Sequence, residues 1–119
     1  MPRRLLVIED DAGSRYAAER VLSAAGYEVY LAPTGAIALD LMRHHQFDGV
    51  LLDVVLPDTT GHAVLGELRQ LQPTIPVIVI SGYQAEALKA VAQGAESYLI
   101  KPYEPSALIN EIRRWIGQP

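Results

Sequence analysis

The chain has 119 residues, of which half are hydrophobic and a fifth are charged, and its formal net charge is −4. This length suits one domain over residues 1–119, and the composition favours a packed core over disorder. The scattered basic residues argue against direct nucleic-acid binding, the lack of cysteine suits a reducing cytoplasm, and no apolar run approaches the ~18 residues of a membrane span.

Short apolar runs alternate with helical patterns from the N-terminus onward. The first half predicts strands at Leu5–Ile8, Tyr27–Leu31 and Phe47–Asp53. A helix that closes at Gly26 separates the first two strands, and a helix capped by Thr34 separates the second from the third. The order of these elements is therefore strand, helix, strand, helix, strand.

The second half continues this alternation after a turn at Asp58–Gly61. It predicts strands at Pro76–Ile80 and Tyr98–Ile100, with a helix before, between and after them, and the last helix begins near Pro105. The residues expected to face inward on the five helices are Ala17, Ala18, Val21, Leu22 and Ala25; Ile37, Ala38, Leu41 and Met42; Val64, Leu65, Leu68 and Leu71; Leu88, Val91, Ala92 and Ala95; and Leu108, Ile109, Ile112, Trp115 and Ile116.

Five apolar strands separated by helices predict an α/β fold, with an open parallel sheet covered by helices on both faces. Polar residues come at the carboxyl end of four strands: Glu9-Asp10, Asp53, Ser81 and Lys101. In such a sheet these ends share one edge, and ligands bind there. Asp53 is therefore expected at the rim of the sheet, where other charged groups can meet it.

The residue types at this edge indicate phosphoryl chemistry. Glu9, Asp10 and Asp53 offer hard oxygen ligands that suit Mg²⁺. Lys101 adds a compact positive charge, and Ser81 adds a hydroxyl donor. A carboxylate nucleophile, Mg²⁺ and a lysine are together the groups needed to form an acyl phosphate.

Four ordered motifs make the chain resemble the receiver domain of two-component response regulators: LLVIEDD, DGVLLDVVLPDTTG, VIVISG and YLIKP. The resemblance implies the flavodoxin-like strand order 2-1-3-4-5. It also implies that Asp53 accepts a phosphoryl group from a sensor histidine kinase or a phosphotransfer protein. Glu9, Asp10, Asp53 and the Val55 carbonyl would then hold Mg²⁺, and Lys101 would pair with the phosphoryl group.

The resemblance further implies a conformational switch. Ser81 would move towards the phosphoryl group, and Tyr98 would turn inward as Ser81 moves. The Lys101–Pro102 peptide bond would be cis. The face formed by the fourth helix, fifth strand and fifth helix would contact an output domain or a second copy of the chain. The residues expected on that face are Lys89, Tyr98, Glu111 and Arg114.

Three features depart from the commonest receiver pattern. Glu9 replaces an aspartate, and the loop reads LPDTTG without the usual methionine. Val55 and Tyr83 flank the path of a hydrolytic water, and neither is a good water-positioning group. We therefore expect slow hydrolysis of the phospho-aspartate, over minutes or longer.

Other interpretations of these residues remain open. The chain could be a pseudo-receiver that binds partners without phosphorylation, although it retains Asp10, Asp53, Ser81 and Lys101. An aspartyl-phosphate type phosphohydrolase would need a second acid where Val55 stands. Asp11 is expected to start a helix. The three histidines have no metal-ligand spacing and are expected at the surface. The chain could be a stand-alone receiver or the N-terminal receiver of a longer regulator, and the final Gln118-Pro119 would suit the start of a linker in the second case.

Overall fold

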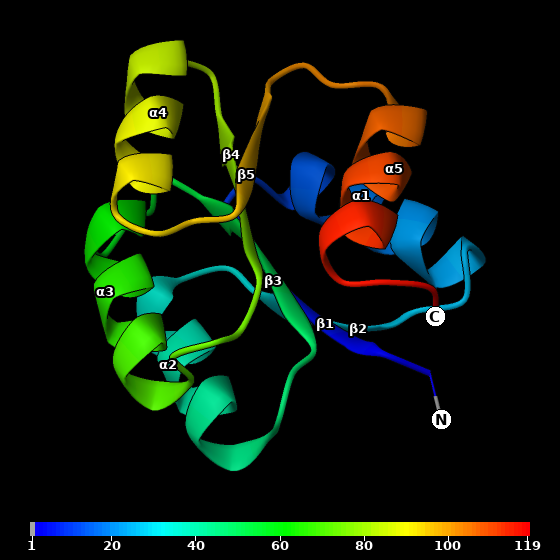
Figure 1. Ribbon diagram of the computed structural model, residues 1–119, viewed down its shortest axis with the longest axis horizontal. Coiled ribbons are helices and arrows are strands. Elements are labelled where there is room, and N and C mark those ends of the chain that lie inside the picture. Colours follow the sequence, from blue (N-terminus) through cyan, green and yellow to red (C-terminus); the bar gives the residue numbers. More distant parts are fainter. Residues whose placement is uncertain (1) are drawn as a thin grey trace.

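The computed structural model describes residues 2–119, in which five strands and five helices alternate as predicted (Figure 1). The elements are β1 (Arg4–Ile8), α1 (Ala12–Ala24), β2 (Glu28–Ala32), α2 (Gly35–His44), β3 (Gly49–Asp53), α3 (Gly61–Leu71), β4 (Val77–Ser81), α4 (Gln84–Ala92), β5 (Ser97–Ile100) and α5 (Pro105–Trp115). All strand pairs are parallel, in the order β2-β1-β3-β4-β5. Both the α/β class and the order implied by the resemblance are confirmed.

The sheet lies between two helical layers, with α1 and α5 on one face and α2, α3 and α4 on the other (Figure 1). Successive side chains of β1 point to opposite faces: Leu5 and Val7 pack towards α1 and α5, and Leu6 and Ile8 pack towards α2 and α3. Because both faces are covered, the central strands need apolar residues at every position, and this explains their unbroken apolar runs.

Short polar caps fix where three helices begin. Asp11 accepts a hydrogen bond from the Ser14 amide at 2.8 Å and starts α1, as predicted. Thr34 caps α2 in the same way, through the Ile37 amide at 3.1 Å. Thr60 caps α3, although the sequence assigned it only to a turn. Each cap lies in a loop at the carboxyl end of the sheet, and the caps therefore help to fix those loops.

The predicted inward faces of the helices were wrong at several positions. Six residues expected to face inward are exposed: Ala17, Ile37, Leu71, Leu88, Ala92 and Trp115. On α4 the small residues Ala87 and Ala90 face the core instead, and half of Leu88 is exposed. The small alanine side chains let α4 pack closely on the sheet. The prediction had taken the larger apolar residues of the helix as its inward face, and it therefore chose the wrong side of α4.

The strand bounds also shifted slightly. β3 begins at Gly49 and not at Phe47, and β2 and β4 lie one residue later than predicted. These differences leave Asp53 and Ser81 as the last residues of β3 and β4.

Within residues 2–119, the helices fall short of the length and apolar character that crossing a membrane requires.

Candidate functional site

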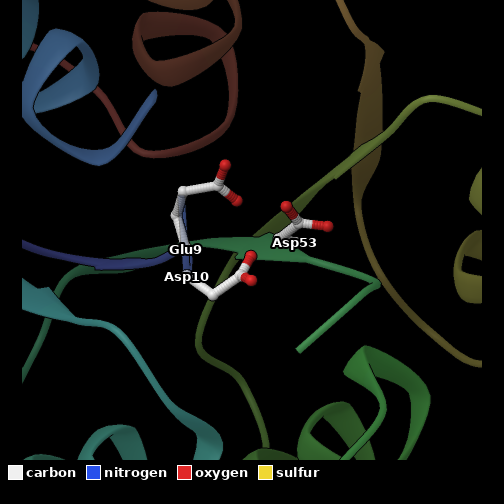
Figure 2. A group of neighbouring side chains, drawn as sticks. All are labelled: Glu9, Asp10 and Asp53. Atoms are coloured by element: carbon white, nitrogen blue, oxygen red, sulfur yellow. The ribbon is translucent and has the colours of Figure 1, made fainter. Parts of the chain in front are cut away.

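Three carboxyl groups meet at the carboxyl edge of the sheet (Figure 2). Glu9 and Asp10 follow β1, and Asp53 ends β3, which pairs directly with β1. One carboxylate oxygen from each residue lies within 4.8 Å of those of the other two. Glu9 and Asp53 are 1% and 5% exposed, whereas Asp10 is exposed to solvent. The strand pairing therefore brings together the acids predicted to form a metal site.

Lys101 supplies a positive charge to this cluster from the end of β5. Its Nζ donates to Glu9 Oε1 at 2.7 Å and to Asp53 Oδ2 at 2.8 Å. The peptide bond between Lys101 and Pro102 is cis, as the resemblance implied. The ammonium thus contacts two of the three carboxyl groups, and the third, that of Asp10, is left to meet further positive charge.

Burial and mutual contact drive the pKa values of the two buried acids apart. Burial, reinforced by the neighbouring Asp53, raises the pKa of Glu9 to about 8. Burial alone would also raise the pKa of Asp53, but Glu9, the Lys101 ammonium and the Val55 amide together hold it below its usual value. Burial lowers the pKa of Lys101, but Asp53 and Glu9 outweigh it and raise that pKa. At neutral pH Asp53 is thus a carboxylate beside a charged lysine.

The residues present fit a hard divalent cation. Glu9 Oε2 is a buried oxygen that lacks a hydrogen-bond partner within residues 2–119, and such an atom normally has one. Glu9 belongs to the same cluster of oxygen donors, and Mg²⁺ prefers oxygen ligands with several retained waters. The exposed Asp10 leaves one side of the cluster open to such waters. The acidic pocket therefore fits aspartyl phosphorylation with Mg²⁺.

The loop after Asp53 is fixed at both of its ends. The Val55 amide donates to Asp53 Oδ1 at 2.9 Å, and this bond orients the carboxylate. Gly61 approaches the backbone so closely that a Cβ there would lie 2.4 Å from the Val54 Cα. Asp58 accepts hydrogen bonds from the first two amides of α2, those of Gly35 and Ala36, each at 2.9 Å. The sequence placed Asp58 only in a turn, and its partners 22 and 23 residues away could not be read from local pattern.

Ser81 lies at the same edge, but its hydroxyl is engaged locally. Ser81 Oγ donates to the Tyr83 carbonyl and accepts from the Tyr83 amide, both at 2.9 Å. Tyr98 is partly buried and packs against the core on the α2–α4 face. The proposed movements of Ser81 and Tyr98 therefore stay predictions.

Of the histidines, His62 takes a more defined position than the sequence suggested. Its two ring nitrogens lie 2.8 Å from Glu86 Oε2 and 2.7 Å from Gln93 Oε1, and it thereby links the start of α3 to α4. His44 is exposed, as predicted. Within residues 2–119, the acidic cluster is the one grouping of His, Asp and Glu side chains with the spacing of a metal site.

Comparisons with known proteins agree on one family. The family model described as "Response regulator receiver domain" matches residues 5–113. The response regulator MprA of a Mycobacterium strain is 36% identical over 115 residues, which are 95% of this chain and 50% of that protein. The response regulator protein FleR of Pseudomonas aeruginosa is 34% identical over 96% of this chain and 24% of its own length.

One similar solved structure is the receiver domain of the sensor histidine kinase PA1611 from Pseudomonas aeruginosa, which carries a magnesium ion coordinated in its active-site cleft. Its TM-score is 0.89 and its identity 26%, over 99% of this chain and all of that one. The chain spans about a quarter of the length of FleR and about half of the length of MprA.

Proposed function

Because this chain belongs to the response regulator receiver domain family, we propose that it is a phosphoacceptor of a two-component phosphorelay. It would take a phosphoryl group from a histidine kinase or a phosphotransfer protein onto Asp53. The observation that carries this proposal is the ionised Asp53 carboxylate, held between the Val55 amide and the Lys101 ammonium in a pocket of oxygen ligands. We further propose that residues 1–119 form one receiver domain.

The side chains suit in-line transfer from a phosphohistidine. A carboxylate oxygen of Asp53 attacks phosphorus as the bond from phosphorus to the imidazole nitrogen breaks, and that nitrogen keeps the electron pair. Because the pKa of Asp53 is low, the nucleophile needs no base. Lys101 stays within reach of the phosphoryl oxygens from its place beside Asp53 Oδ2. Mg²⁺, held by Glu9, Asp10, Asp53 and the Val55 carbonyl, would neutralise charge on those oxygens.

The output would follow from a shift between two conformations. A phosphoryl group adds charge and strong acceptors at Asp53, and contacts with Ser81 and Lys101 can bias an existing equilibrium. Tyr98 would carry this change to the face formed by α4, β5 and α5. Lys89 and Arg114 are exposed there, whereas Glu111 hydrogen-bonds to Ser97 and Trp115. This face is the proposed contact for an output domain or a second copy. The domain would thus act as a switch and not as a turnover enzyme.

The decisive test is intact-mass spectrometry after incubation with acetyl phosphate, with and without Mg²⁺. We expect one added phosphoryl group on the wild type in Mg²⁺, and none on Asp53→Asn or after removal of Mg²⁺ by chelation. Beryllofluoride, a phosphoryl mimic, provides an independent probe of the same pocket. If the wild type takes up neither group, the chain is a pseudo-receiver and the charges at the rim are structural.

The phospho-aspartate should decay slowly, over minutes or longer, and Val55→Asn should make it decay several-fold faster. Val55 is 62% exposed beside Asp53, and its aliphatic side chain cannot orient a water for attack, whereas an amide can. Decay is measured by the loss of the phosphorylated mass after the phosphodonor is removed. Leu71→Asn, at an exposed apolar position at the end of α3, is the matched control. Equal decay rates in Val55→Asn and the wild type would contradict the prediction.

A further inference from the structure

Arg15 is the side chain that ties α1 back to the loop carrying two of the proposed metal ligands. Its Nη1 donates to the Glu9 carbonyl and to the Asp10 carbonyl, each at 3.0 Å. Arg15 is half-buried, and its guanidinium lies 5.2 Å from the centre of the Tyr16 ring, a contact that further restricts it. A single charged donor thus holds two consecutive peptide groups at the point where the chain leaves β1.

Other contacts hold Glu9 and Asp11, but not the Asp10 side chain. Lys101 Nζ donates to Glu9 Oε1 at 2.7 Å. The Glu9 amide donates to the Ala32 carbonyl at 3.0 Å, and Asp11 caps α1 one residue beyond Asp10. The Asp10 carboxylate itself makes no hydrogen bond to any part of residues 2–119 that the structure describes, and it is exposed to solvent. Its direction therefore depends on the backbone that carries it, and Arg15 holds the carbonyl of that same residue.

We propose that Arg15 is a positioning residue for the Mg²⁺ site, and this inference rests on the function proposed above. By holding the Glu9 and Asp10 carbonyls, it fixes the backbone that directs the Asp10 carboxylate towards Asp53 (Figure 2), whereas Lys101 holds the Glu9 carboxyl group itself. Groups that orient metal ligands without touching the metal commonly have large effects on affinity.

The charge of Arg15 and its positioning role predict opposite results. A guanidinium near the site repels a second cation, and its removal would by charge alone tighten Mg²⁺ binding. Loss of the two hydrogen bonds would instead free the loop and weaken binding. The direction of the change in affinity therefore separates the two effects.

The test measures Mg²⁺ affinity by calorimetry in the wild type, Arg15→Met, Arg15→Lys and Arg20→Met. We expect Arg15→Met to weaken binding roughly 10- to 100-fold. Arg15→Lys keeps the charge, but its nitrogen lies one bond nearer the backbone than Arg15 Nη1, which makes both hydrogen bonds. Because the shorter side chain reaches the two carbonyls less well, we expect it to bind Mg²⁺ more weakly than the wild type and more tightly than Arg15→Met. Arg20 is an exposed arginine on the same helix, and Arg20→Met should leave the affinity unchanged.

Hydrogen exchange in metal-free protein gives a second readout that needs no bound ion. The hydrogen-bonded amides that flank this loop, those of Glu9 and Ser14, should exchange faster in Arg15→Met than in the wild type, while those in the middle of β1 and β3 should keep their protection. If Arg15→Met fails to fold, Arg15→Lys carries the test, since weaker binding with the charge retained cannot be a charge effect. Unchanged or tighter Mg²⁺ binding in Arg15→Met, or wild-type affinity in Arg15→Lys, overturns the inference alone. A wild type that binds no Mg²⁺ overturns the proposed function as well.

Discussion

Mg²⁺ should bind this domain about tenfold more tightly for the pH unit gained between about pH 6 and pH 7, and less steeply as the pH approaches 8. The pKa of Glu9 is raised to about 8, chiefly by burial, and metal binding requires the ionised carboxylate. Below that pKa each bound Mg²⁺ must displace one proton, and this displacement produces the tenfold slope. Asp53 is already ionised over this range because its pKa lies below 3.8, and it adds no slope.

Calorimetric titration with Mg²⁺ at several pH values measures the slope directly. Repeating the titration in buffers with different ionisation enthalpies counts the protons released, which should approach one at pH 6 and fall towards zero above pH 8. The matched variant Glu9→Gln has no proton to lose, and its weaker affinity should not change with pH. A wild-type affinity that stays constant across the range would show that Glu9 is ionised before the metal arrives.

The same shift affects the stability of the metal-free domain. Folded Glu9 keeps its proton up to about pH 8, whereas the unfolded chain releases it near the ordinary value of 4.5. Glu9 therefore contributes stability that is complete below 4.5 and is lost as pH rises through 8. The lowered pKa of Asp53 and the raised pKa of Lys101 act below 3.8 and above 10.5, outside this window. Mg²⁺ should restore stability at alkaline pH, because it binds the ionised form.

The sequence was sufficient to predict the α/β class and which acids lie at the sheet edge, because both depend on local pattern. Unbroken apolar runs ending in Asp53, Ser81 and Lys101 identify parallel strands with a polar edge. The strand order came from the resemblance, since periodicity is the same for any order of strands. The prediction of which face of α4 points inward was wrong, because Ala87 and Ala90 pack on the sheet and the larger Leu88 does not.

Residues that act through backbone groups left no signal in the sequence. Asp58 caps a helix that begins 23 residues earlier, and Arg15 binds carbonyl oxygens, which every residue has. Neither contact requires a particular residue type in its partner. These two side chains hold the loops that carry the predicted site residues, and only the three-dimensional structure reveals them.

Lys101→Met should slow phosphorylation by acetyl phosphate roughly 10²- to 10³-fold. The Lys101 ammonium is the cationic side chain that contacts Asp53 within residues 2–119, and in the proposed reaction it would stabilise charge on the transferring group. Lys101 also helps to lower the pKa of Asp53. Without the ammonium, a smaller fraction of the Asp53 carboxyl group is therefore ionised at acid pH. The rate is measured from the growth of the phosphorylated mass with time.

Lys89→Met is the matched control, because Lys89 is the other lysine of the chain and lies exposed on α4. Mg²⁺ affinity separates the two roles that Lys101 could have. If the ammonium acts on the phosphoryl group, its loss slows transfer but leaves Mg²⁺ binding equal or tighter, because one repelling charge has gone. If it serves mainly to hold Glu9 and Asp53 in place, Mg²⁺ binding weakens together with the rate. A Lys101→Met rate equal to that of the wild type would remove Lys101 from the chemistry and leave Mg²⁺ as the main charge that favours transfer.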